Sequence, residues 1–197
     1  MALLIGITGE NLLPDEDRLI VTALESGVDL IHLRKPLASC QQFCDLLNAI
    51  PERYYRRIVL HDFHVLAQQY AVHGIHLNRR FPVVPETYRG AMSRSCHTLA
   101  EVVACKTQYD YVFLSPVCDS ISKQGYRAAF TCNQLEDAAR CGTIDSKVIA
   151  LGGISPDNIA GILRYGFGGV AVLGYLWREP EVEAVKQAVG KLKANMI

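Results

Sequence analysis

The sequence predicts a single short (β/α)8 barrel spanning residues 1–197, and three observations lead to this fold class. Apolar runs of strand length alternate with helix-length amphipathic segments along the chain, without a linker or a low-complexity break. Eight such βα units in 197 residues lie at the low end of the size range of this fold. The glycine-rich strand ends come late in the chain, where such barrels commonly bind phosphate.

Eight short apolar runs are the expected strands. In chain order they are Leu3–Thr8, Leu30–Arg34, Ile58–His61, Gly74–Leu77, Ala91–Ser95, Tyr111–Ser115, Val148–Leu151 and Gly169–Leu173. An open, doubly wound sheet is the alternative way to arrange such units. It would bind phosphate at its first βα turn, but residues 7–14 (ITGENLLP) contain neither a GxGxxG pattern nor a lysine-containing P-loop. The barrel is therefore favoured.

Seven segments between these strands have helical spacing or helix-start residues. They are Asp15–Ser26, Ser39–Ile50, Phe63–Ala71, Thr98–Lys106, Cys132–Cys141, Pro156–Tyr165 and Glu181–Lys193. The crossover after the fourth strand is different, because Asn78–Gly90 contains two prolines and two aromatic residues where a helix would be expected. We expect this fourth crossover to be irregular.

Composition favours a small-molecule ligand in a reducing compartment. Twenty basic residues balance twenty acidic ones, so no net field attracts nucleic acid or an anionic membrane surface. No apolar run reaches the roughly 18 residues that a membrane span requires. Seven cysteines without a CxxC pair indicate free thiols, which predicts a cytoplasmic protein. The sequence leaves a homo-oligomer possible.

The late glycines are the strongest local signal for a binding site. Gly152 and Gly153 end the seventh expected strand, and Gly174 follows the eighth. Glycine allows the backbone to approach a ligand closely, and free N–H groups at a helix start favour an anion. We therefore expect a phosphate to bind there. The alternative is that these glycines only permit tight strand-to-helix turns.

Two further groups of polar residues stand at strand ends. His32 and Arg34 alternate on the side of the second strand opposite Ile31 and Leu33, and an arginine there suits a phosphate. A surface ion pair is the alternative for Arg34. After the sixth strand, a loop carries two hydroxyls and a lysine, which can clamp an anion or can simply be solvated. These residues are Ser120, Ser122 and Lys123.

Taken in order, these groups make the chain resemble the thiamine-phosphate synthase family from the first strand to the last. The resemblance is carried by His32-Leu33-Arg34, His61-Asp62, Gly74-Ile75-His76-Leu77, Ser95-Cys96-His97, the segment Ser115–Lys123 and Gly152-Gly153-Ile154. It implies a transferase of thiamine biosynthesis. Such an enzyme couples a hydroxymethylpyrimidine diphosphate to a thiazole phosphate, releases pyrophosphate and uses Mg²⁺.

The resemblance also implies roles for individual residues. Arg34, Ser95 and Lys123 would act on the diphosphate as the catalytic residues, and Asp62 would bind the magnesium ion. The remaining substrate-binding positions would be His32, His61, Ser120, Ser122, Gly152, Gly153 and Gly174. These assignments predict small phosphate esters as the partners of the site.

The chain departs from the family pattern chiefly on the diphosphate side. Phe81 stands where the family has a second magnesium carboxylate, and Pro36 replaces a lysine, although Lys35 is adjacent. His61 replaces an asparagine. Two other functions therefore stay open: a thiazole tautomerase-like isomerase, and a non-catalytic module that binds thiazole or thiamine phosphate.

Histidines near the expected barrel mouth raise two further questions. His32, His61 and His97 are candidates for an acid or base near neutral pH. The spacings His61-x-x-His64 and His73-x-x-His76 could also indicate zinc. Because each of these residues stands at a strand boundary and no cysteine lies at ligand spacing, ordinary strand-end histidines are favoured over a zinc site.

Overall fold

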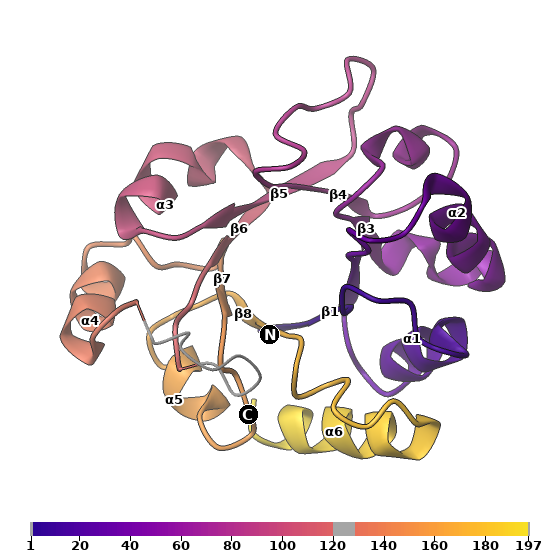
Figure 1. Cartoon of the computed structure of the whole chain (residues 1–197). Helices are drawn as coiled ribbons and strands as arrows, with labels where there is room; N and C mark the ends of the chain where they lie inside the picture. Colours follow the sequence, from indigo (N-terminus) through magenta and orange to yellow (C-terminus); the bar gives the residue numbers. More distant parts are fainter. Residues whose placement is uncertain (1, 120–128, 197) are drawn as a thin grey trace.

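Eight parallel strands form a closed barrel in which each strand pairs with the next along the chain, and the eighth pairs with the first. The computed structural model describes residues 2–119 and 129–196. The strands are β1 (Leu3–Ile7), β2 (Leu30–Leu33), β3 (Ile58–Leu60), β4 (Gly74–Leu77), β5 (Ala91–Cys96), β6 (Tyr111–Leu114), β7 (Val148–Leu151) and β8 (Gly169–Val172). Figure 1 looks into the ring of strands, with the helices outside it. The predicted (β/α)8 barrel and its eight strands are confirmed.

Among the described residues, six α-helices cover the outside of the barrel: α1 (Glu16–Glu25), α2 (Cys40–Ala49), α3 (Leu99–Cys105), α4 (Cys132–Arg140), α5 (Ile159–Leu163) and α6 (Val182–Ala194). Three short 3₁₀ helices accompany them in this part of the chain: η1 (Glu52–Arg57), η2 (His64–Gln68) and η3 (Lys106–Gln108). Reciprocal capping boxes start α2, α3 and α4, with Ser39, Thr98 and Thr131 as the N-caps. Of the helices described, none is long and apolar enough to cross a membrane.

The crossovers on either side of β4 differ in how well the sequence predicts them. A full helix over Phe63–Ala71 is a wrong prediction, because only η2 forms there. Phe63 has a φ of 52°, in the left-handed region, so it lies outside the helical turn that follows, and its ring packs on Phe43. The irregular crossover over Asn78–Gly90 is confirmed. This segment extends outward between β4 and β5 without a helix (Figure 1).

Alternate strand residues face two different cores. One set fills the barrel interior and includes Leu30, Tyr111 and Phe113, while Ile31 and Leu33 pack between the barrel and its helices. His32 is completely buried, and its ring lies 4.8 Å from that of Phe113 between centroids, so it points into the barrel, on the side opposite Ile31 and Leu33. The same alternation brings Arg34, just beyond β2, to the mouth of the barrel.

Candidate active site

A cavity of about 630 Å³ opens at the ends of several barrel strands. Its lining is strongly basic, with four arginines and one glutamate: Arg34, Arg79, Arg80, Arg94 and Glu101. The other lining residues are Ile7, His61, Leu77, Asn78, Pro82, Ser95, His97, Phe113, Leu151 and Leu173. In such barrels, loops at the carboxyl ends of the strands build the active site. The chemistry of this cavity suits an anionic ligand.

Arg34 is fixed at the mouth by backbone contacts with the end of β1. Its N–H donates to the hydroxyl of Thr8 at 2.9 Å, and that hydroxyl donates to the Arg34 carbonyl at 3.2 Å. The guanidinium is partly exposed and donates to Glu10 at 3.0 Å. The ion pair considered from the sequence is therefore present. Because Arg34 also lines the cavity, the pair does not remove it from the site.

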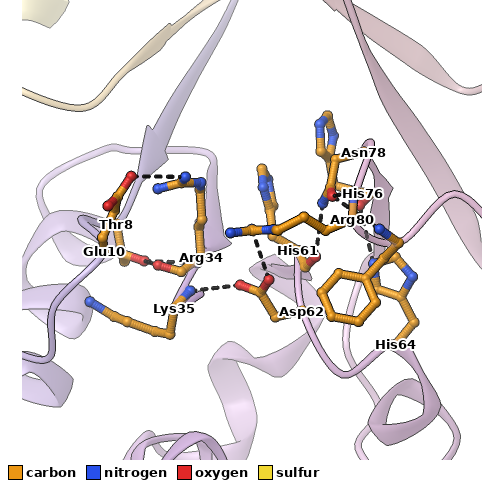
Figure 2. Close-up of polar contacts among 11 residues, drawn as sticks. Thr8, Glu10, Arg34, Lys35, His61, Asp62, His64, His76, Asn78 and Arg80 are labelled. Carbon is orange, nitrogen blue, oxygen red and sulfur yellow. Dashed lines mark hydrogen bonds and ion pairs between the residues drawn. The ribbon is translucent and has the colours of Figure 1, made fainter. Parts of the chain in front are cut away.

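Asp62 lies beneath the arginines of the cavity lining and is almost completely buried. Its Oδ2 accepts a hydrogen bond from the backbone N–H of Lys35 at 2.7 Å, and its Oδ1 accepts one from Arg80 at 2.9 Å. Figure 2 shows the carboxylate between these two donors. Both of its oxygens are thus engaged by the protein.

The expected magnesium ligands do not form an oxygen-rich site in this arrangement. Mg²⁺ requires near-octahedral oxygen coordination, usually with carboxylate ligands. Asp62 is instead neutralised by a guanidinium, and Phe81 supplies no oxygen from its side chain. As they stand, these residues fit an arginine cation better than a magnesium ion.

Lys35 cannot take the place of the family lysine that Pro36 replaces. Its ammonium is completely buried and donates to Glu16 at 2.5 Å and to the carbonyls of Gly9 and Asn11 at 3.0 and 2.6 Å. Burial lowers the pKa of Lys35, although the hydrogen bond and charge of Glu16 oppose the change. Lys35 therefore holds the β1–α1 loop and does not line the cavity.

A group of three histidines occupies the barrel interior below the cavity. His32 Nδ1 lies 2.7 Å from His61 Nε2, and His32 Nε2 lies 2.6 Å from the hydroxyl of Tyr111. The ring of His76 stacks on that of His61, with 4.1 Å between centroids. Burial lowers the pKa of all three imidazoles, and that of His76 falls to about 3. They are neutral at physiological pH.

Both ring nitrogens of His76 have hydrogen-bond partners within the protein, so neither needs a metal ion as a partner. Its Nδ1 and Nε2 each lie 2.8 Å from a serine hydroxyl, those of Ser93 and Ser95. One ring nitrogen from each of His32, His61 and His76 lies within 4.8 Å of the others, which is the one such group of possible metal ligands in the described part of the chain. It differs from both histidine pairs considered from the sequence spacing.

His97 and Glu101 form the wall of the cavity beside β5 and α3. The exposed His97 has its Nδ1 3.2 Å from the carbonyl of Ser115. Glu101 accepts hydrogen bonds from the N–H groups of His97 and Thr98, which caps α3. The hydrogen bond from His97 is the main reason why the pKa of Glu101 is lowered. The carboxylate of Glu101 is therefore largely engaged by the backbone at the start of α3.

The glycines after β7 have a packing role. Gly152 and Gly153 have φ values of 99° and 66°, in the region that favours glycine. A Cβ on Gly152 would lie 2.8 Å from the Cα of Pro116, and one on Gly153 would lie 2.2 Å from the carbonyl oxygen of Asp119. These contacts support the interpretation that the two glycines permit a tight turn, whereas phosphate binding there stays a proposal.

Of the residues singled out in the sequence, Arg34, His61 and Ser95 line the cavity. It places His32 below the cavity, where it reaches the lining through His61. Asp62, Gly152, Gly153 and Gly174 are not among the residues that line it. Ser120, Ser122 and Lys123 lie outside the described residues.

Three cavity arginines were missed by the sequence reasoning. Arg79 and Arg80 belong to the irregular segment after β4, and Arg94 lies within β5. Two consecutive arginines at the end of a barrel strand were the available signal for the first two. No spacing pattern marks Arg94 as a cavity residue.

Comparisons with known proteins find that this chain is similar to thiamine-phosphate synthases. The thiamine-phosphate synthase of Nitrosococcus oceani is 26% identical over 197 residues, covering 94% of this chain and 89% of the relative. That of Actinobacillus succinogenes is 28% identical over 204 residues, covering 92% and 87%. The crystal structure of thiamine phosphate pyrophosphorylase from Bacteroides thetaiotaomicron has a TM-score of 0.89 and 40% identity, covering 99% of this chain and 97% of that one.

A thiamine phosphate pyrophosphorylase from Pyrococcus furiosus superposes with a TM-score of 0.78 at 21% identity, which supports the fold alone. The family model described as thiamine monophosphate synthase matches residues 4–176. This match covers β2 to β8 completely and β1 except for its first residue. The chain therefore belongs to the thiamine monophosphate synthase family, whose members are transferases of thiamine biosynthesis.

Proposed function

We propose that this chain couples a hydroxymethylpyrimidine diphosphate to a thiazole phosphate and releases pyrophosphate. The observation that carries the proposal is the arginine-rich cavity at the barrel mouth of a member of this family. A leaving diphosphate needs positive charge beside it, and arginine offers a planar pair of donors to phosphate oxygens. Four arginines against one glutamate supply that charge.

In this reaction, the bond between the pyrimidine methylene carbon and the diphosphate oxygen breaks, and both electrons leave with pyrophosphate. The thiazole nitrogen then donates its lone pair to the methylene carbon and forms the new C–N bond. Proton transfer contributes little to such a step. The site must mainly hold two substrates in register and stabilise the charge that grows on the leaving group.

Arg34 and Ser95 are proposed to contact the diphosphate, because both line the cavity. Ser95 is oriented from below by His76, whose Nε2 lies 2.8 Å from its hydroxyl. His61 presents the histidine group to the same cavity. Lys123 is proposed as a third diphosphate contact, by its position in the family pattern alone.

The second substrate, the thiazole phosphate, is proposed to bind to the residues that the family pattern indicates. Ser120 and Ser122 would orient the thiazole, and Gly152, Gly153 and Gly174 would take its phosphate. The N–H groups of the glycine turns are suited to phosphate oxygens. We propose a cytoplasmic location for this chemistry, which the seven free cysteines support.

Enzymes of this family generally use Mg²⁺, and Asp62 is the expected ligand in this chain. A magnesium ion would have to compete with Arg80 for this carboxylate. The roles proposed above for the arginines, the serine and the histidines do not pass through a metal.

The decisive assay incubates purified protein with both substrates and measures pyrophosphate and thiamine phosphate. We expect the two products to appear in equal amounts. Folded protein at high concentration that yields neither product, with or without Mg²⁺, would contradict the proposal. Calorimetry with thiazole phosphate would then test the binding-module alternative, and an NMR assay of thiazole isomerisation would test the tautomerase alternative.

A further inference from the structure

We infer that the guanidinium of Arg80, in place of a divalent cation, supplies the positive charge beside Asp62 when the cavity binds a diphosphate. Binding of pyrophosphate by this chain would then be independent of magnesium. The identity of the anion rests on the proposed function. The contacts of Asp62 and Arg80, the segment that carries Arg80 and the charge of the cavity each support the inference.

The carboxylate of Asp62 already has a cation. A buried carboxylate is costly unless it is paired and hydrogen-bonded, and Arg80 provides both the charge and a donor at 2.9 Å. The backbone N–H of Lys35 satisfies the other oxygen at 2.7 Å. A magnesium ion brought to this carboxylate would compete with Arg80 for the same negative charge. The site is therefore built around the arginine.

The irregular segment after β4 is anchored so that Arg80 reaches Asp62. The amide of Asn78 donates to the carbonyl of His61 at 3.0 Å, and its oxygen accepts from the N–H groups of Arg80 and Phe81 at 2.9 and 3.2 Å. Figure 2 shows Asn78 between the end of β3 and this segment. One side chain thus ties Arg80 to the strand that leads into Asp62.

Arg80 also faces the ligand space. Its side chain is 42% exposed, against 2% for Asp62, and it lines the cavity together with Arg34. A guanidinium carries five N–H donors, so the hydrogen bond to Asp62 leaves others for phosphate oxygens. Arg80 can therefore bridge the buried carboxylate and a bound anion, which is the position that a metal ion would otherwise occupy.

The described residues offer magnesium few oxygen ligands in this region. Phe81 stands where the family pattern has the second carboxylate, and Glu101 is used to cap α3. The one group of possible metal ligands found among the described residues consists of neutral imidazoles, whereas Mg²⁺ prefers oxygen. Four arginine side chains, by contrast, line the cavity and supply its positive charge.

The inference is tested by titrating inorganic pyrophosphate into the purified protein in a calorimeter, once in EDTA and once with excess Mg²⁺. We expect binding in EDTA, with a Kd that magnesium changes by less than about threefold after correction for the magnesium–pyrophosphate complex in solution. A titration of Mg²⁺ alone should give no saturable heat.

Variants test whether Arg80 supplies the positive charge that binds pyrophosphate. Arg80→Gln should weaken binding in EDTA at least tenfold, and Arg80→Lys should restore part of the loss, because a point charge replaces the fork. Asp62→Asn should bind at least as well as the parent protein, since it removes a negative charge near the anion. Arg89→Gln is the matched control. Arg89 lies in the same segment, donates to the carbonyls of Glu86 and Tyr88, and does not line the cavity.

The outcomes separate this inference from the proposed function. Pyrophosphate binding that requires Mg²⁺ and disappears in Asp62→Asn would overturn the inference and leave the coupling reaction intact. Binding in EDTA that Arg80→Gln does not weaken would also overturn it. Magnesium-independent binding that depends on Arg80, in a protein that forms no thiamine phosphate, would support the inference while the proposed function fails. Thermal midpoints of all variants verify that each is folded.

Discussion

The imidazole nitrogens His32 Nδ1 and His61 Nε2 lie 2.7 Å apart inside the barrel, so one of these rings donates a hydrogen bond to the other. Such a contact requires at least one of the two nitrogens to be free of a proton. His76, stacked on His61, lies between two serine hydroxyls. The three neutral rings thus form a polar layer between the apolar interior of the barrel and the basic cavity.

We expect this layer to make the protein sensitive to acid. Burial lowers the pKa of each of the three imidazoles, that of His76 to about 3, whereas the unfolded chain has a histidine pKa of about 6.5. Below pH 6.5 the unfolded chain therefore binds protons that the folded chain does not. The stability contributed by these groups is present above pH 6.5 and is lost as the pH falls toward 3.

The measurement is urea unfolding at several pH values between 7.5 and 4.5. Each group that titrates only in the unfolded chain adds a slope of about 1.4 kcal/mol per pH unit. His76→Gln should reduce the slope by about one such group. An unchanged slope in His76→Gln would mean that this imidazole is not responsible for the acid sensitivity.

The buried ion pair between Lys35 and Glu16 leads to a prediction about stability. Replacing Lys35 by Met leaves Glu16 as an uncompensated buried charge, and such a loss costs about 3–5 kcal/mol. The double variant Lys35→Met with Glu16→Leu should recover a large part of this free energy, although the carbonyls of Gly9 and Asn11 still lose their donor. Urea unfolding of both variants measures the difference. Equal stabilities would show that the residual charge of Glu16 is not the cause.

Gly153 should tolerate no side chain. Gly153→Ala would place a Cβ 2.2 Å from the carbonyl oxygen of Asp119 at a φ of 66°, so the backbone has to move. We expect a loss of more than about 2 kcal/mol, which is above the cost of an ordinary surface substitution. Gly161→Ala is the control, because nothing lies within 4 Å of its Cβ position in α5 and alanine favours helix by up to about 1 kcal/mol. Thermal unfolding of the two variants should therefore shift in opposite directions.

Periodicity predicts the parts of this fold that depend on single strands. The alternation in β2 correctly places His32 on the side opposite Ile31 and Leu33, and the apolar runs give all eight strands. The same rule stops where a strand ends. Lys35 is the second residue after β2, and its ammonium is buried with Glu16, a direction that no local pattern predicts.

Contacts between distant segments could not be derived from the sequence. The ion pair between Arg80 and Asp62 exists because an irregular segment folds back over the end of β3, held by Asn78. The resemblance to the family marked Asp62 as a metal ligand, while the residue that engages it lies in the crossover with the least regular pattern. His76, which completes the histidine group, appeared in a family motif and in a zinc spacing with His73, but neither pattern predicts its contact with His61, which arises from the pairing of β3 with β4.

The last prediction concerns Arg34, which lines the cavity and also pairs with Glu10. If its guanidinium stabilises the leaving diphosphate, its contribution grows as the bond breaks, so turnover should fall more than thiazole phosphate binding does. We expect Arg34→Ala to lose about a hundredfold in rate, as for other deleted transition-state donors, and Arg34→Lys to recover only part of it.

Glu10→Gln separates this role from the ion pair. A partly exposed pair contributes about 1 kcal/mol or less, so both Arg34→Ala and Glu10→Gln should change the thermal midpoint only slightly. If Arg34 acts only through the pair, the two variants should have the same small effect on rate. If Arg34 contacts the diphosphate, only its own removal should slow turnover severely, because Glu10→Gln leaves the guanidinium in place and removes a competing negative charge. A fully active Arg34→Ala variant would mean that the diphosphate binds elsewhere in the cavity.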